Sequence, residues 1–149
     1  MDIVFNKKAR FNYEILEDIE AGIVLTGTEV KSLRQKKVAI VDSYAIFRRH
    51  ELYLVNLRVD PYSHGHQFNH EPGRSRKLLL HKKQLEQLRI KVTQKGCVLF
   101  PLKMYINEKG KVKVLIGVGK GKKNFDKRET IKTRDTKREM ERDMKSYKK

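Results

Sequence analysis

The sequence lacks several features that would assign it to particular classes of protein. It has no tryptophan, three prolines and a single cysteine among 149 residues. Cys97 alone cannot form an intrachain disulfide, and the apolar run around it, GCVLFPL, indicates a buried thiol in a reducing compartment. No apolar run approaches the roughly 20 residues that a membrane-spanning helix needs. The first twelve residues also lack the apolar segment of a secretory signal. We therefore expect a cytoplasmic protein that does not enter a membrane.

Sequence motifs of nucleotide-binding proteins and enzymes are missing as well. The glycines at 117, 119 and 121 do not have the spacing of a phosphate-binding loop, so we expect them to end a strand and let the backbone approach RNA phosphates. There is no G-x-S-x-G, no histidine near Cys97 in the sequence, and no pair of carboxylates in a catalytic setting. We expect no cofactor and no enzymatic activity.

Acidic residues are scarce relative to basic ones, and the imbalance is uneven along the chain. The sequence has 35 Lys and Arg against 18 Asp and Glu, a net charge of +17. Thirteen of the basic residues lie between 120 and 149, where the only large apolar side chains are Phe125, Ile131, Met140, Met144 and Tyr147. Ordering a residue costs about 1–2 kcal/mol, which so little apolar area cannot offset. We expect a folded domain at 1–119 and a basic tail at 120–149 that is disordered when free.

The part before the tail has mostly the pattern of β-strands. Gly110 in NEKGK supplies the positive φ of a tight turn between two of them. We expect two strands around a polar corner in SYAIFRRHELYLVNLRV, and six in all, at 13–19, 21–27, 43–59 (two), 97–106 and 111–119.

Two segments have the pattern of helices. TEVKSLRQ (28–35) begins at the capping residue Thr28, and HKKQLEQLRIKVT (81–93) places Leu85, Leu88 and Val92 on one side. Six short strands with helices closing the ends predict a mainly β fold. Specifically, we expect a small antiparallel barrel of the oligonucleotide-binding (OB-like) type with two to three flanking helices.

Three basic runs lie next to aromatic, apolar or glycine residues. NKKAR (6–10) precedes Phe11 and Tyr13, GRSRK (73–77) leads into three leucines, and GKGKK (119–123) contains two glycines. Lysines and arginines neutralise phosphates, and aromatic rings stack on bases. Three such runs in one small basic protein indicate RNA binding.

The segments that carry a family resemblance follow in order over nearly the whole chain. NKKARFNYEILEDIEAGIVLTGTEVKSLR, DSYAIF, RSRKLLLH, PLKMYIN, KVKVLIGVGKGKK and DKR resemble the small protein B family (SmpB), bacterial tmRNA-binding proteins. The resemblance implies an OB-like barrel that binds the tRNA-like domain of tmRNA. It further implies delivery, with elongation factor Tu and the aminoacylated tmRNA, to ribosomes stalled on mRNA that lacks a stop codon. The tail would then fold as a helix along the rRNA of the decoding centre and the mRNA channel.

The resemblance also assigns roles to residues. It gives RNA contacts to Asn6, Glu20 and Leu79 and to the lysine pair of GKK, whereas Phe11 departs from the histidine of many relatives. The residues expected to contact RNA are Asn6, Lys7, Arg10, Phe11, Glu20, Arg74, Arg76, Lys77, Leu79, Lys120, Lys122 and Lys123. The tail residues expected to engage the ribosome are Asp126, Lys127, Arg128, Lys132, Arg138, Met140 and Met144.

Two alternative functions remain open from the sequence. One is a generic ribosomal or single-stranded-RNA protein, which charge alone would allow. The other is a metal-dependent RNA hydrolase built on His64, His66 and His70, three imidazoles within seven residues.

Overall fold

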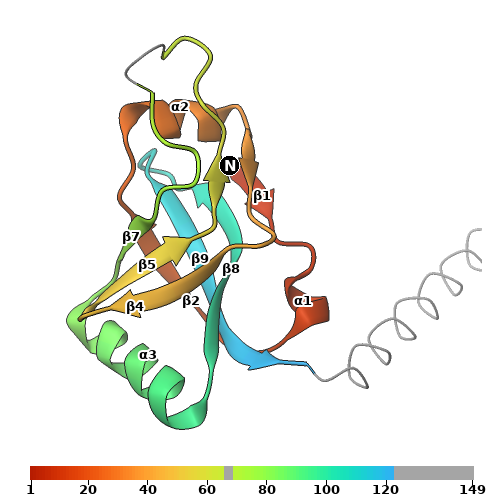
Figure 1. Cartoon of the computed structure of the whole chain (residues 1–149), viewed down its shortest axis with the longest axis vertical. Helices are drawn as coiled ribbons and strands as arrows, with labels where there is room; N and C mark the ends of the chain where they lie inside the picture. The colour runs from red at the N-terminus through yellow and green to blue at the C-terminus, as the bar shows by residue number, and fades with distance from the viewer. Residues whose placement is uncertain (66–68, 123–149) are drawn as a thin grey trace, which may run out of the picture.

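A closed ring of antiparallel strands forms the body of the protein. The structure is a computed structural model that describes residues 1–65 and 69–122. The main sheet has the order β1-β8-β4-β5-β7-β2-β9, and β8 also pairs with β9, so six strands close on themselves and β1 adds outside β8 (Figure 1). Its strands are β1 (Asp2–Phe5), β2 (Tyr13–Ile23), β4 (Tyr44–Arg48), β5 (Glu51–Val55), β7 (Arg76–Leu79), β8 (Val98–Ile106) and β9 (Val112–Gly121). A separate pair joins β3 (Val38–Ala39) to β6 (Arg58–Val59).

The core fills the inside of this ring because apolar residues alternate along the strands. On β9, Val112, Val114, Ile116 and Val118 are all buried, while Lys113 between them points outward. They pack with Leu52, Leu54, Leu78, Leu99 and Met104 from the other strands of the ring. Where the alternation holds, as on β9, one face of a strand is committed to the interior and the other is partly exposed.

Three helices accompany the ring within the described residues: α1 (Ala9–Asn12), α2 (Gly27–Arg34) and α3 (Lys82–Lys95). Figure 1 shows α2 and α3 at opposite ends of the ring. Leu88 of α3 is buried, and Leu85 and Val92 pack against the core as their spacing predicts. Gly96 ends α3 at φ +68°, a conformation that glycine adopts without steric cost. None of these helices is long and apolar enough to cross a bilayer.

The prediction of a mainly β antiparallel fold with two to three helices is confirmed, but its details need correction. The strands expected at 13–19 and 21–27 are one continuous strand, β2, and β7 was not predicted. The predicted number of six strands still agrees with the ring, because the one strand too many at 13–27 is offset by the unpredicted β7. Thr28 is not the cap of α2, since Thr26 accepts the capping hydrogen bond from the Glu29 amide. The helix α1 and the short strands β1, β3 and β6 were not predicted either.

The expected role of the glycines near the end of β9 is only partly right, because β9 does end at Gly121 but Gly119 lies inside the strand. Gly119 is buried inside β9, where a Cβ would lie 2.0 Å from the carbonyl oxygen of Glu14 on β2. A side chain at this position would force the two strands apart. Gly119 therefore serves the packing of β2 against β9. The expected domain boundary after residue 119 falls inside β9, which continues to Gly121.

Candidate nucleic-acid interface

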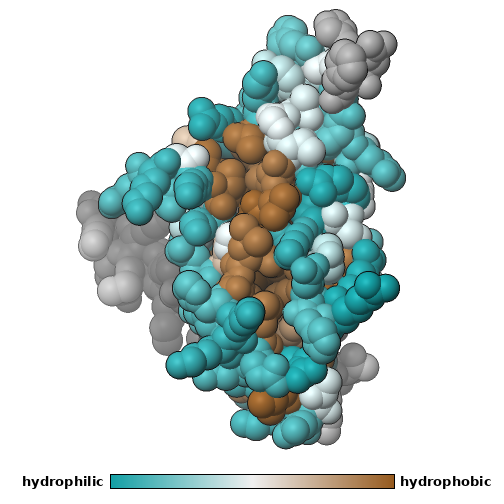
Figure 2. All heavy atoms as spheres, turned by 90° about the vertical axis from the view of Figure 1, so that its left-hand side faces the viewer, coloured by the Kyte–Doolittle hydropathy of each residue, from teal (hydrophilic) through white to brown (hydrophobic). Residues whose placement is uncertain are grey.

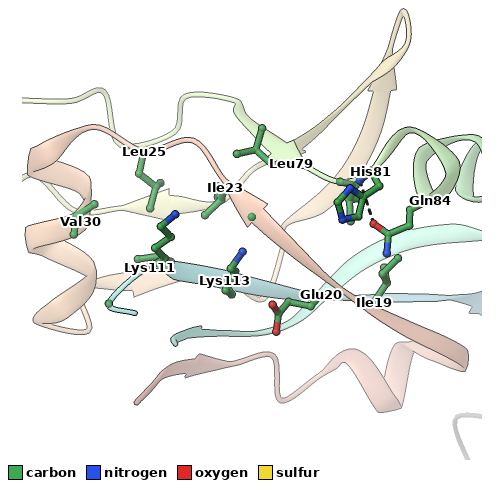
Figure 3. A pocket seen from close by; sticks show the side chains of 14 residues that line it. Ile19, Glu20, Ile23, Leu25, Val30, Leu79, His81, Gln84, Lys111 and Lys113 are labelled. Atoms are coloured by element: carbon green, nitrogen blue, oxygen red, sulfur yellow. Dashed lines mark hydrogen bonds between the residues drawn. The ribbon is translucent and has the colours of Figure 1, made fainter. Parts of the chain in front are cut away.

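An apolar groove with a charged border lies where β2, β7 and β9 meet α2 and α3. Its volume is about 880 Å³. Figure 2 shows the apolar strip on this face, bordered by hydrophilic side chains. The apolar lining includes Ile19, Ile23, Leu25, Val30, Leu79, Leu80 and Val112, and the polar lining includes Glu20, His81, Gln84, Lys111 and Lys113 (Figure 3). A ligand in this groove would meet an apolar floor and a border of mainly basic charge.

Leu79 is the most exposed apolar side chain of this groove. Its exposed fraction is 50%, although it belongs to β7 in the closed ring. Gly22 lies opposite on β2, and a Cβ there would come within 3.2 Å of the Leu79 Cβ. Because Gly22 has no side chain, there is room for the Leu79 side chain beside it. A half-exposed leucine held in this way can pack against the flat face of a ligand.

Glu20 is a carboxylate placed among lysines. The Tyr105 hydroxyl donates a hydrogen bond to Glu20 Oε2. Burial, together with this bond and the charge of Glu20, raises the pKa of Tyr105 to about 12. Lys111 and Lys113 line the same cavity, about 650 Å³ in volume, as these two residues. A carboxylate held by a tyrosine in basic surroundings can accept hydrogen bonds from base amino groups or a ribose 2′-OH.

Asn6 anchors a second cavity next to the first. Its Nδ2 donates to the carbonyl oxygen of Pro101 at 2.9 Å, and its backbone N–H donates to the Leu102 carbonyl at 2.8 Å. Its buried Oδ1 has no hydrogen-bond partner among the described residues. The cavity has a volume of about 850 Å³, and its basic lining consists of Lys7, Arg10, Lys103 and Lys122.

The two cavities share one surface because both are built on β2 and β9. Leu115, which lines the Asn6 cavity, pairs directly with Glu20, which lines the groove. Lys122 follows β9 and donates from Nζ to the Arg10 carbonyl at 2.7 Å, which ties the end of β9 to α1. We call the surface formed by the groove and the Asn6 cavity the β2–β9 face.

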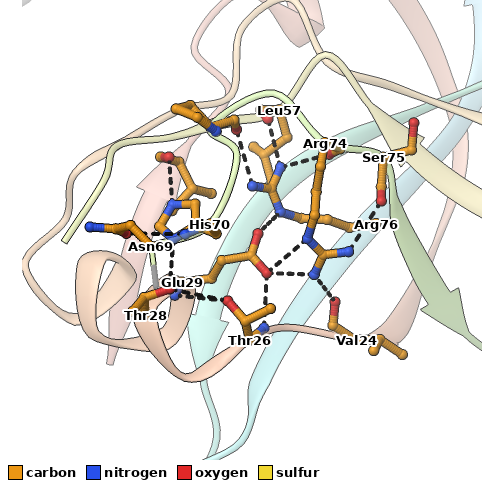
Figure 4. A network of polar contacts seen from close by, with 12 residues as sticks. Val24, Thr26, Thr28, Glu29, Leu57, Asn69, His70, Arg74, Ser75 and Arg76 are labelled. Atoms are coloured by element: carbon orange, nitrogen blue, oxygen red, sulfur yellow. Dashed lines mark hydrogen bonds and ion pairs between the residues drawn. The ribbon is translucent and has the colours of Figure 1, made fainter. Parts of the chain in front are cut away.

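Arg76 is removed from the expected RNA contacts because its side chain has no exposed surface. Its Nε bonds to Glu29 Oε2, and its Nη1 donates to the Leu57 carbonyl at 2.8 Å (Figure 4). Arg74 donates from Nη2 to Glu29 Oε1 at 2.5 Å. Burial opposes the charge on Glu29, but hydrogen bonds from Arg74, the Thr26 amide and Arg76 outweigh it and lower the pKa of the carboxyl. The two arginines thus hold the N-terminus of α2 against the segment that enters β7.

His70 belongs to the same structural network. Its Nε2 lies 2.8 Å from the carbonyl oxygen of Val59, and a carbonyl can only accept, so Nε2 carries the proton. Its Nδ1 then accepts from the Thr28 hydroxyl at 2.9 Å. Both ring nitrogens are therefore used, which argues against His70 as a metal ligand. His64 lies edge-on to Tyr62, and His66 is outside the described residues.

The remaining predicted residues lie at several places. Lys77 pairs with Glu51 at 2.9 Å, and Lys120 is exposed on β9 opposite Glu14. Phe11 is half-buried in α1. Lys123 and all seven tail residues, from Asp126 to Met144, lie outside the described residues. The structure therefore brings together Asn6, Lys7, Arg10, Glu20, Leu79 and Lys122 on the β2–β9 face.

Among the residues that sequence reasoning missed are Lys103, Lys111 and Lys113 of this face, and Tyr105, which holds Glu20. Lys103 and Tyr105 come from β8, and Lys111 and Lys113 come from the hairpin that follows. The signal was present in KVKVLIGVG, because a period of two places both lysines on the side opposite the buried valines. These residues escaped notice because they do not form an uninterrupted basic run.

Comparisons with known proteins agree on one family. The model of the SmpB protein family matches residues 3–146. The SsrA-binding protein of Nostoc punctiforme is 55% identical over 146 residues, which cover 97% of this chain and 94% of that relative. The SsrA-binding protein of Flavobacterium johnsoniae is 50% identical over 144 residues, which cover 97% and 95%. A chain of the solved structure described as "tmRNA-SmpB: a journey to the center of the bacterial ribosome" has a TM-score of 0.69 and 54% identity, covering 83% of this chain and 87% of that one.

Proposed function

The chain belongs to the SmpB family, and from this premise we propose that it binds SsrA RNA (tmRNA) through the β2–β9 face. It is an SsrA-binding protein of trans-translation and not an enzyme. The part of tmRNA recognised is its tRNA-like domain, and the protein acts in the cytoplasm.

The observation that carries this proposal is the setting of Glu20. Lysines alone would bind any polyanion with strong salt dependence and little preference. A carboxylate oriented by Tyr105 beside Lys113, above a groove that presents Leu79, repels phosphates and accepts only hydrogen-bond donors. This combination favours RNA that offers bases or 2′-OH groups in a fixed shape over RNA that offers phosphates alone.

We further propose how the bound protein works with its other partners. The folded part, which includes all of β9 up to Gly121, holds the tRNA-like domain, and the tail that follows it reaches the ribosome. There Asp126, Lys127, Arg128, Lys132, Arg138, Met140 and Met144 contact the rRNA of the decoding centre and the mRNA channel. Elongation factor Tu carries the aminoacylated tmRNA to a ribosome stalled on mRNA without a stop codon.

Competition binding tests the recognition step. A labelled tRNA-like domain is bound to the full chain at physiological salt and displaced by either the unlabelled domain or an unstructured RNA of equal length. We expect the unstructured RNA to need at least tenfold higher concentration, because counterion release alone gives no such preference. Equal displacement would instead identify a generic RNA-binding protein.

Truncation tests the division of labour between the two parts. A chain that ends at residue 123 keeps the whole β2–β9 face, so we expect it to bind the tRNA-like domain within about twofold of the full chain. We expect the same chain to fail in tagging peptides on stalled ribosomes. A loss of RNA affinity that matches the loss of tagging would contradict the separation of roles.

A further inference from the structure

A second groove lies between β4, β8 and the C-terminal half of α3. Its volume is about 540 Å³. Tyr44 and Val98 are each 41% exposed, and Cys97 closes the groove from the core side. Its apolar and aromatic lining consists of Tyr13, Tyr44, Ala45, Ile46, Phe47, Val92, Cys97, Val98 and Leu99. Apart from Tyr13, none of the residues that the sequence connects with RNA binding lies in it.

The charged side chains that line this groove are positive. Arg49, in the turn between β4 and β5, and Arg89, on α3, are its two charged lining residues. Within residues 1–65 and 69–122 no carboxylate lines it, whereas Glu20 lines the groove of the β2–β9 face and Glu14 lines the Asn6 cavity. Glu86 pairs with Arg89 at 2.5 Å from outside the lining. Apolar walls between two guanidinium groups suit a flat, apolar ligand that carries negative charge at its edge.

One aromatic ring of the groove is fixed in place and connects it to the β2–β9 face. Tyr13 stacks on the buried Phe100 with ring centres 4.1 Å apart and planes 10° apart. The stack fixes the Tyr13 ring before any ligand arrives. Tyr13 also lines the Asn6 cavity, so the two sites share one side chain. An RNA strand bound at Asn6 would therefore lie next to a residue that also lines the second groove.

The backbone at Arg49 allows a substitution that adds no strain. Arg49 has φ +59°, in the left-handed region that glycine adopts freely and residues with a Cβ adopt rarely. A tight turn between two strands normally has Gly, Asn or Asp at such a position. Lys36 has the same φ, so it offers a matched position for comparison.

We infer that this groove is a second RNA-binding surface, which takes an unstacked base of single-stranded RNA between Tyr44 and Tyr13 and the flanking phosphates on Arg49 and Arg89. The inference rests on the proposed RNA-binding function and extends it beyond the β2–β9 face. Base stacking on aromatic rings next to arginines is how proteins commonly bind single strands.

A glycine substitution tests the arginine without damaging the fold. Arg49→Gly removes the charge and relieves the positive φ, so the melting temperature should stay equal or rise. The matched control is Lys36→Gly, which removes one charge at the same φ of +59° just after α2, at the other end of the ring. The probe is fluorescently labelled hexaadenylate, titrated at several salt concentrations.

We expect Arg49→Gly to weaken hexaadenylate binding about threefold or more at 0.1 M salt and to lower the salt slope by about 0.7, while Lys36→Gly changes neither. Equal effects of the two substitutions would overturn the inference. Tyr44→Ala should reduce the preference for hexaadenylate over an abasic oligomer of the same length. An unchanged preference would show that Tyr44 does not stack on a base in this groove. If hexaglutamate displaces the probe as well as unlabelled hexaadenylate does, the groove is an acidic-peptide site instead. If any of these results contradicts the second groove, the affinity of the Arg49→Gly variant for the tRNA-like domain is the separate test of the proposed function. An unchanged affinity would still support binding of that domain at the β2–β9 face.

Discussion

Replacement of Leu79 by alanine separates apolar recognition of RNA from electrostatic attraction. Leu79 stands half-exposed in the groove, so the substitution removes the part of the side chain that a ligand would cover. It removes no charge and no hydrogen bond. We therefore expect weaker binding of the tRNA-like domain with an unchanged salt dependence.

The magnitude follows from the exposed fraction. Full burial of a leucine side chain contributes about 1.5–3 kcal/mol. With 50% of Leu79 still exposed, about half of this, roughly 1 kcal/mol, remains to be gained on binding. Its loss corresponds to an approximately fivefold higher Kd. The other half already stabilises the fold, so the free energy of unfolding should fall by a similar amount.

Fluorescence anisotropy with the labelled tRNA-like domain measures both the Kd and its slope against salt. Leu16→Ala is the matched control, because Leu16 is 55% exposed on β2, the strand next to β7, but lines neither cavity of the β2–β9 face. The control should bind like the unmodified protein. The reasoning is refuted if both variants lose affinity equally, or if Leu79→Ala changes the salt slope instead of the Kd at fixed salt.

Three further predictions follow from the charged residues. Glu29→Gln leaves the buried guanidinium of Arg76 without its carboxylate partner. Urea unfolding should then show that the free energy of unfolding falls by about 3–5 kcal/mol. Replacement of both Glu29 and Arg76 by methionine should lower it by less. The pKa of Glu29 is lowered by folding, so its contribution is present above its unfolded value and is lost as pH falls through the folded value; an acid titration of stability for Glu29→Gln should lack this component. Lys113→Gln should reduce the salt slope of tRNA-like domain binding by about 0.7–0.9, and an unchanged slope would remove Lys113 from the interface. The pKa of Tyr105, about 12 in the fold, should move toward 10 in Glu20→Gln but not reach it, because burial persists; alkaline absorbance, with Tyr105→Phe as the blank, measures the shift. Because this pKa is raised, the stability from the pair is present below the unfolded pKa near 10 and lost as pH rises through about 12.

Much of the fold could be predicted because strand and helix patterns in this chain are local. The alternation in KVKVLIGVG predicts β9, and the spacing of Leu85, Leu88 and Val92 predicts α3. Strand β7 was missed because RKLL is short and its outer residues are a lysine and a leucine, which do not alternate clearly. The break placed after residue 19 was wrong because EAG has the composition of a turn, while Gly22 in fact makes room for Leu79.

The candidate site shows where sequence reasoning stops. A basic run in the sequence shows where charge lies along the chain but not which way each side chain points. Arg74 and Arg76 were therefore grouped with Lys7 and Arg10, although Arg74 and Arg76 point toward the buried carboxylate of Glu29. The buried acid that pairs with them, Glu29, lies 47 residues from Arg76 in sequence, and no local pattern connects the two. The β2–β9 face is assembled from segments far apart in the sequence, and only the three-dimensional pairing of the strands brings them together.

Site-directed photocross-linking tests the central claim most directly. A photoreactive amino acid is placed at Lys113, on β9, or at Tyr53 on β5, which lies three strands away from β9 in either direction around the ring. We predict that the tRNA-like domain of tmRNA cross-links to the probe at 113 and not to the probe at 53. Efficient cross-linking at 53 with none at 113 would place the RNA on the opposite side of the ring and contradict the account.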